Sequence, residues 1–120
     1  FTAEALSGSP RMSLSLVTMF IPSNDAFLAL GGQDGIELFD DTDAPQTGNV
    51  TNVVGLWDAG TEVNQEPGVG NHQAQRQRAA GVGDVEREVV TPMVRVNGYD
   101  YPDPSDVVQI TLSAEEVGDQ

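Results

Sequence analysis

Carboxylates are the side chains best suited to chemistry in this chain, and they gather in three short clusters. The first is Ser-Asn-Asp at residues 23–25, in a turn between two apolar runs. The second is Asp-Asp-Thr-Asp at residues 40–43, and the third is Asp-Ala-Gly-Thr-Glu at residues 58–62. Carboxylate oxygens on turns, together with backbone carbonyls, are the ligands that calcium takes. All three clusters are therefore candidate calcium sites.

The second and third clusters differ as calcium candidates. Residues 40–43 resemble the start of an EF-hand loop, but Gly is missing at the sixth position and Glu at the twelfth, so we interpret them as a solvated loop. In the third cluster, Gly60 allows a tight turn, and the carboxylates of Asp58 and Glu62 can then converge on one ion. By spacing alone, a turn that simply ends a strand is the better interpretation of this segment.

Catalytic arrangements find little support in the sequence. His72 is the single histidine, and it lies in a Gly-rich stretch, where we interpret it as an exposed loop residue. The chain has no Gly-x-Ser-x-Gly elbow, and the Gly-rich residues 31–35 lack the Lys of a phosphate-binding loop. We predict that the protein is not an enzyme. A carbohydrate-active enzyme with paired carboxylates remains an alternative, since 19 acidic residues are available.

The charge balance excludes several classes of partner. There are 19 acidic residues against five basic ones, all Arg, and the formal net charge is −14. Such a surface repels nucleic acid, anionic membranes and sulfated glycosaminoglycans, because their binding requires Lys and Arg. No apolar run reaches the roughly 18 residues of a membrane helix, so we expect no membrane insertion. The absence of Cys excludes disulfides and thiolate metal sites.

The elements that must position these carboxylates are strands. Polar–apolar alternation, short apolar runs and β-branched runs predict strands at 12–20, 26–30, 50–57, 85–96 and 107–112, with a weaker one at 35–39. Pro92 indicates a sheet edge, a bulge or a break, and Asn-Gly at 97–98 indicates a hairpin turn. Residues 58–83 form a long irregular stretch, of a length that is usually functional. Without a convincing helix, the chain is predicted to be an all-β, antiparallel β-sandwich.

Two segments resemble the N-terminal domain of the spondins. Residues 13–28 read Ser-Leu-Ser-Leu-Val-Thr-Met-Phe-Ile-Pro-Ser-Asn-Asp-Ala-Phe-Leu, similar to the family's strand and turn in which a Met precedes Pro-Ser/Thr-x-Asp-x-Phe. Residues 56–64 read Leu-Trp-Asp-Ala-Gly-Thr-Glu-Val-Asn, similar to the family's Trp/Tyr-Asp-Ala-Gly-Thr-Asp/Glu motif. The resemblance covers about residues 12–112, and it implies a single C2-like β-sandwich domain over residues 1–120 with calcium held by loops at one end.

The resemblance also implies ligands and a function. Asp25, Asp58 and Glu62 are the implied calcium ligands, and the last position is Asp in the animal members. The implied function is a secreted or cell-surface, calcium-binding module for adhesion or matrix assembly. The family's glycosaminoglycan contacts do not carry over to a chain of net charge −14.

The start of the chain differs from the family. The family domain has strands upstream of the Met-rich one, whereas eleven residues precede Met12 here. Either the chain is a fragment or processed product, or another chain completes the sheet. We therefore expect a protein partner, or self-assembly, through open sheet edges. A structural subunit of an extracellular filament is the alternative function.

Overall fold

The fold consists of short antiparallel strands. The computed structural model describes residues 1–79, 81–93 and 99–117. Its main sheet has the order β2-β3-β6-β7, with bounds Val17–Met19, Ala26–Leu30, Val54–Asp58 and Thr91–Pro92. Two smaller antiparallel pairs join β1 (Ser13–Leu14) to β4 (Ile36–Glu37), and β5 (Gly48–Asn49) to β8 (Thr111–Leu112). Three short 3₁₀ helices lie between them: η1 (Gly32–Asp34), η2 (Thr51–Val53) and η3 (Pro104–Asp106).

The pair formed by β3 and β6 is the centre of the structure. The register runs from Ala26 opposite Asp58 to Leu30 opposite Val54. Since side chains alternate across a strand, Leu28 and Leu30 share one face, and with Val54 they form the buried core cluster. The partly buried side chains packed against this cluster are Leu14, Ile36, Val50, Leu56, Val108 and Ile110.

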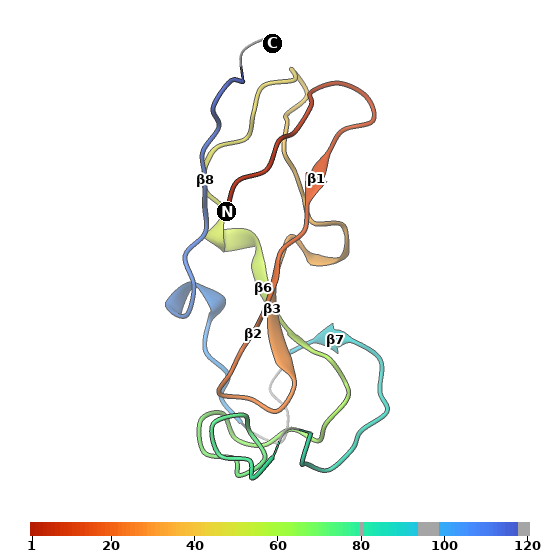
Figure 1. The fold of residues 1–120 in the computed structure, drawn as a ribbon, viewed down its shortest axis with the longest axis vertical. Helices are drawn as coiled ribbons and strands as arrows, with labels where there is room; N and C mark the ends of the chain where they lie inside the picture. Colours follow the sequence, from red (N-terminus) through yellow and green to blue (C-terminus); the bar gives the residue numbers. More distant parts are fainter. Residues whose placement is uncertain (80, 94–98, 118–120) are drawn as a thin grey trace.

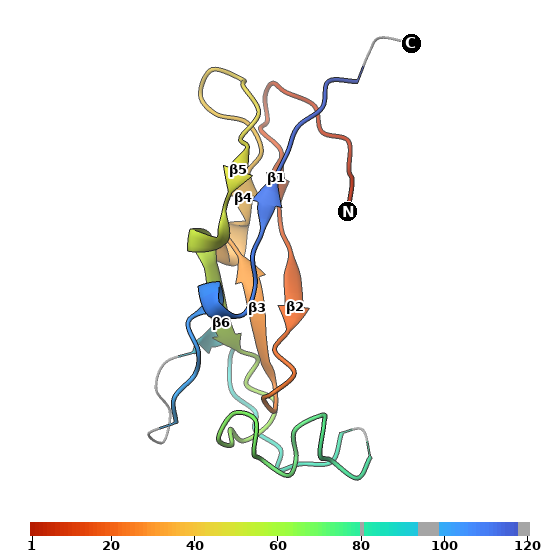
Figure 2. The same cartoon turned by 90° about the vertical axis from the view of Figure 1, so that its left-hand side faces the viewer.

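A second layer covers this face of the main sheet. The C-terminal segment holds Val108 and Ile110 against the core cluster. The Val50 N–H donates to the Ile110 carbonyl at 2.9 Å, and the Ile110 N–H donates to Thr51 Oγ1 at 2.9 Å. The described chain is thus all-β and antiparallel, in a small β-sandwich-like fold, which confirms the predicted fold class. Figure 2 shows the C-terminal segment in front of the main sheet.

Several predicted strands are shorter or interrupted. The predicted strand 12–20 divides because its partner chain turns sharply at residues 31–35, between β3 and β4. Gly35 has φ 70°, and a Cβ there would lie 2.2 Å from the Leu14 carbonyl oxygen, so the break is built into the packing. The segment predicted as a strand at 50–57 begins with η2 instead, and its strand, β6, starts at Val54. Only residues 111–112 of the predicted 107–112 are strand, because η3 and its turn hold the preceding residues.

The segment after the long loop differs most from expectation. Within the described residues, only Thr91–Pro92 of the predicted strand 85–96 is a strand. Pro92 lies on β7, at one end of the sheet order, which confirms the prediction of an edge. The predicted Asn-Gly turn at 97–98 lies outside the described residues.

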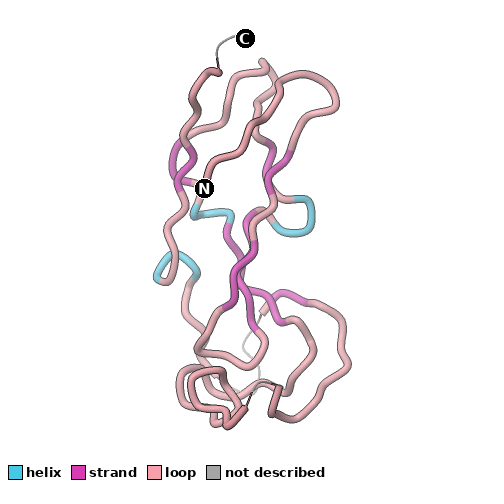
Figure 3. The backbone as a smooth tube through the Cα atoms, in the orientation of Figure 1, coloured by secondary structure: helices cyan, strands magenta, loops and turns pink. Residues whose placement is uncertain are grey.

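The molecule is elongated for its length. Its principal extents are 53 × 27 × 26 Å, and its radius of gyration is 17.5 Å, against about 14 Å for a compact chain of this size. Loops account for most of the tube in Figure 3, and Figure 1 shows the loops after β6 gathered at the end of the molecule opposite the C-terminus. In the described part of the chain, no helix has the length and apolar character needed to cross a membrane.

Candidate metal-binding site

Asp25 joins two turns that are far apart in sequence. It directly precedes β3, and because β3 and β6 are antiparallel, the turn after Asp58 lies at the same end of the sheet. Asp25 Oδ2 accepts hydrogen bonds from the Thr61 N–H at 2.7 Å, Thr61 Oγ1 at 3.1 Å and the Glu62 N–H at 2.9 Å. The structure therefore brings Asp25 to the 58–62 turn through direct hydrogen bonds.

Local sequence sets the turn that presents Asp25. The buried Ser23 hydroxyl donates to the Phe20 carbonyl, and it accepts from the Ala26 N–H at 3.1 Å. A side-chain hydroxyl thus takes the place of a backbone partner in a four-residue turn. Asp25 leaves this turn with its carboxylate directed at the neighbouring loop.

Asp58 stabilises its own turn. Its side chain is 9% exposed, Oδ1 accepts from the Gly60 N–H at 2.8 Å, and Oδ2 accepts from Asn64 Nδ2 at 2.9 Å. Gly60 has φ 73°, and a Cβ there would lie 2.5 Å from the Glu88 carbonyl oxygen. The turn therefore requires glycine both for its conformation and for the close approach of the chain at Glu88.

Glu62 lies where the turn pairs with a later segment. The Glu86 N–H donates to the Thr61 carbonyl at 2.9 Å, the Val63 N–H donates to the Asp84 carbonyl at 2.9 Å, and Glu62 bridges to Val85. This pairing brings Glu86 to the same end of the sheet. Glu86 is absent from the ligands predicted from sequence. The alternation of Asp84, Glu86 and Glu88 in an extended segment was a signal that was available for it.

Three carboxylate oxygens at this end are buried without a partner. They are Asp25 Oδ1, Glu62 Oε1 and Glu86 Oε2, none of which has a hydrogen-bond partner among the described residues. A buried carboxylate oxygen left unpaired is costly, and such groups in proteins are normally satisfied by a water or an ion. Gly83 contributes to the enclosure, because a Cβ on it would lie 2.2 Å from Glu62 Oε1.

The site has a strongly negative field. Burial raises the pKa of Glu62, and the Asp25 charge raises it further, while His72 opposes the shift. Burial also raises the pKa of Glu86, with contributions from Asp58 and Asp25. The pKa of Tyr101 rises to about 12, again through burial first and then through the charges of Asp58 and Asp25. Each raised pKa means that the protonated, neutral form of the group is favoured, and a nearby cation would oppose the shift.

The donor set fits calcium in its chemistry. In the described ranges, no group of three Asp, Glu or His side chains is arranged so that it can hold a metal ion as it stands. Calcium takes six to eight oxygens, and backbone carbonyls, Asn side chains and waters complete a set that two carboxylates begin. Asp25 and Glu62 are the two carboxylates that could begin such a set. Each has a buried oxygen without a partner among the described residues, and the charge of Asp25 adds to the effect of burial in raising the pKa of Glu62. Asp58 uses both its carboxylate oxygens within its own turn.

A buried amide network holds the long loop against this site. Gln73 is 1% exposed; its Nε2 donates to the Glu66 carbonyl at 2.8 Å, and its Oε1 accepts from the Gly68 N–H at 3.0 Å. The side chains of Asn24 and Gln65 are also paired, with Asn24 Nδ2 donating to Gln65 Oε1 at 3.2 Å. The burial of Gln73 and its contacts was not predicted from sequence, because a Gln in a polar loop carries no pattern that marks it as buried.

His72 and Trp57 lie close to the network and the sheet. His72 is partly buried rather than exposed as predicted, and its backbone N–H donates to Gln65 Oε1 at 3.0 Å, which holds the loop there. Trp57 is partly buried at the end of β6, opposite Phe27 and Pro92.

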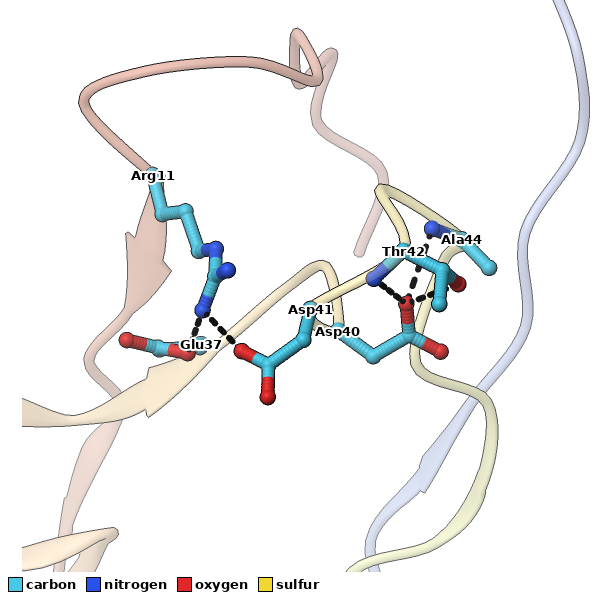
Figure 4. A network of polar contacts seen from close by, with 6 residues as sticks. All are labelled: Arg11, Glu37, Asp40, Asp41, Thr42 and Ala44. Carbon is cyan, nitrogen blue, oxygen red and sulfur yellow. Dashed lines mark hydrogen bonds and ion pairs between the residues drawn. The ribbon is translucent and has the colours of Figure 1, made fainter.

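The 40–43 cluster is a separate, exposed loop. Asp40 Oδ1 accepts from the Thr42 N–H at 2.8 Å, Thr42 Oγ1 at 2.6 Å and the Ala44 N–H at 3.1 Å, and these bonds lower the Asp40 pKa. Arg11 contacts Asp41 at 2.8 Å and Glu37 at 3.2 Å. Figure 4 shows both sets of contacts. The partners of these acids are exposed residues close by, which is consistent with a solvated surface loop.

Comparison of the chain with protein families, with characterised proteins and with solved structures finds no match. The resemblance to the spondin N-terminal domain therefore stays a prediction.

Proposed function

We propose that the chain is an extracellular, calcium-binding interaction module that serves adhesion or surface assembly. The observation that carries the calcium proposal is the pair of buried, unpaired carboxylate oxygens on Asp25 and Glu62, with a third such oxygen on Glu86 at the same end of the sheet. Calcium at this end would neutralise charges that now repel each other, and would tie the Asp25 turn to the 58–62 turn and to the segment with Glu86. Asp58 would act mainly by holding the turn in shape.

The overall charge supports the same proposal. A net charge of −14 makes the surface attractive to divalent cations. Extracellular modules bind calcium with dissociation constants of about 10⁻⁴–10⁻³ M, which is affinity that a partly completed oxygen site can supply. An interaction role, rather than a catalytic one, is supported by exposed apolar side chains on β2, where Val17 is 66% and Met19 is 51% exposed.

The test is thermal unfolding of the wild type and Glu62→Gln, each with calcium and with excess chelator. Glu62→Gln keeps the shape of the side chain and removes its charge. In chelator, we expect the variant to be more stable than the wild type, because it removes a charge that burial and then Asp25 disfavour. With calcium at 100 times its dissociation constant, the wild type should gain about 2.7 kcal/mol, and the variant much less.

Glu115→Gln is the matched control, since Glu115 is exposed and distant in sequence from the site. It should respond to calcium as the wild type does. Equal calcium responses in the wild type and Glu62→Gln, or no response in either, would refute the proposed site.

A further inference from the structure

The outer edge of β2 is an open strand edge. The Leu30 N–H donates to the Leu16 carbonyl at 2.9 Å, and the Phe20 N–H donates to the Ala26 carbonyl at 2.9 Å. In an antiparallel pair the direction of the backbone groups alternates, so the N–H and C=O groups of Val17 and Met19 point away from β3. Within the described residues, β2 ends the sheet order on this side, and these groups have no strand partner.

An apolar groove of about 300 Å³ lies beside this edge. Its lining contains no Asp, Glu, Lys or Arg side chain, and includes Phe1 at the N-terminus with Leu16, Thr18, Leu28, Leu30, Val108 and Ile110. The groove therefore opens between β2 and the C-terminal segment that packs on the core cluster. Thr18 is opposite Leu28, so its side chain is on the groove face of the sheet.

An open edge next to an apolar groove is the arrangement that binds an added strand. The edge supplies main-chain hydrogen bonds, and the groove receives alternate side chains of the incoming strand. Natural proteins protect such edges with charges, Pro or bulges, whereas β2 has the sequence Val-Thr-Met with none of these.

Charge decides between the two kinds of strand that could bind here. A second copy of this chain would bring a net charge of −14 against a net charge of −14. A segment with Lys or Arg at its ends would instead be attracted by the whole molecule, while its apolar residues enter the uncharged groove.

We propose that the β2 edge and its groove bind an extended segment of another protein, with alternating apolar residues and flanking Lys or Arg, as an added strand. This inference rests on the proposed interaction function and names its partner, but it does not depend on the calcium site.

The probe is a synthetic peptide of alternating Val and Thr with two Arg at each end, and its binding is followed by fluorescence polarisation in excess chelator. We expect saturable binding that weakens with salt, and no binding for the same peptide with Glu in place of Arg. Hydrogen exchange should slow at the amides of Val17 and Met19 when the peptide binds.

Val17→Pro removes one outward N–H without removing a bond to β3, and it should weaken binding at least tenfold. Val17→Thr keeps the backbone N–H and has a side chain of similar shape, so it should bind the peptide within about threefold of the wild type. Thr18→Lys is the second variant if Val17→Pro does not fold. It places a positive charge at the groove, so we expect at least a tenfold loss with an unchanged circular dichroism spectrum.

Three results would overturn the inference. They are equal binding by the wild type and Val17→Pro, equal binding of the Arg and Glu peptides, or a dimer at low salt whose formation protects Val17 and Met19. Because the assay runs in chelator, failure of the calcium experiment leaves peptide binding intact. Failure of the peptide experiment likewise leaves the calcium response intact.

Discussion

At the scale of single residues, the candidate site consists of acids in different electrostatic states. Asp25 and Asp58 each accept hydrogen bonds from nearby backbone N–H groups. Glu62 and Glu86 each have a buried oxygen without a partner among the described residues, and burial raises the pKa of both. In the absence of a cation, we therefore expect Glu62 and Glu86 to lower stability at neutral pH.

The raised pKa values predict how stability depends on pH in chelator. Since the folded-state pKa of Glu62 and Glu86 lies above the ordinary 4.5, the folded chain holds more protons than the unfolded one just above that pH. The free energy of unfolding should then fall as pH rises from about 4.5 toward 7. Urea unfolding at several pH values measures this, and Glu62→Gln with Glu86→Gln should flatten the slope. A steeper fall in the double variant would contradict the assignment.

At the scale of elements, a close approach of two segments shapes the site. The 58–62 turn and the 84–88 segment are held together by backbone hydrogen bonds, including one from the Glu88 N–H to the Gly60 carbonyl at 2.9 Å. The amide network around Gln73 closes the loop between them. The loop thus behaves as an ordered part of the site, although it contains no regular strand or helix among its described residues.

Gly60→Ala should be strongly destabilising. A Cβ at Gly60 would lie 2.5 Å from the Glu88 carbonyl oxygen, in addition to the strain of φ 73°. Gly68→Ala is the matched control: Gly68 has φ 82°, but nothing lies within 4 Å of its added Cβ. The control should cost about 1–2 kcal/mol, the range for left-handed strain, and Gly60→Ala at least about 2 kcal/mol more. Urea unfolding measures both, and equal costs would mean that the close approach is not important for stability.

At the scale of the whole molecule, a small core opposes a large negative charge. The buried apolar residues in the described chain are few: Phe20, Ala26, Leu28, Ala29, Leu30 and Val54. The net charge of −14 acts against this core through repulsion between acids across an elongated surface. Cations, whether bound at the site or in the surrounding solution, should therefore be the main external source of stability.

Salt should stabilise the protein even without calcium. In chelator at pH 7, raising sodium chloride from 0.02 to 0.5 M should increase the melting temperature by roughly 5 °C, because it screens repulsion over distances beyond a few ångström. At pH 4.5, close to the isoelectric point of about 4.1, the increase should largely disappear. A melting temperature that falls with salt at pH 7 would show that specific ion pairs outweigh the net repulsion.

The sequence by itself determined the fold class and the placement of Asp25 and Asp58 at one end of the sheet. A short apolar run ended by two glycines located 26–30 with its true bounds. Asp25 directly precedes β3 and Asp58 ends β6, and the antiparallel register brings these positions together. These are local signals, because strand periodicity and turn chemistry act over a few residues.

Only the tertiary structure decided which acids lie at the candidate site and which strands lie at the edges of the sheet among the described residues. Glu86 reaches Thr61 across a loop of more than twenty residues, and the buried Gln73 donates from Nε2 to Oδ1 of the distant Asn24 at 3.5 Å. The predicted strand 12–20 divides because its partner turns at Gly35. Such outcomes depend on contacts between distant segments, whose free energy reflects burial and loop closure across the whole chain, and no short pattern encodes them.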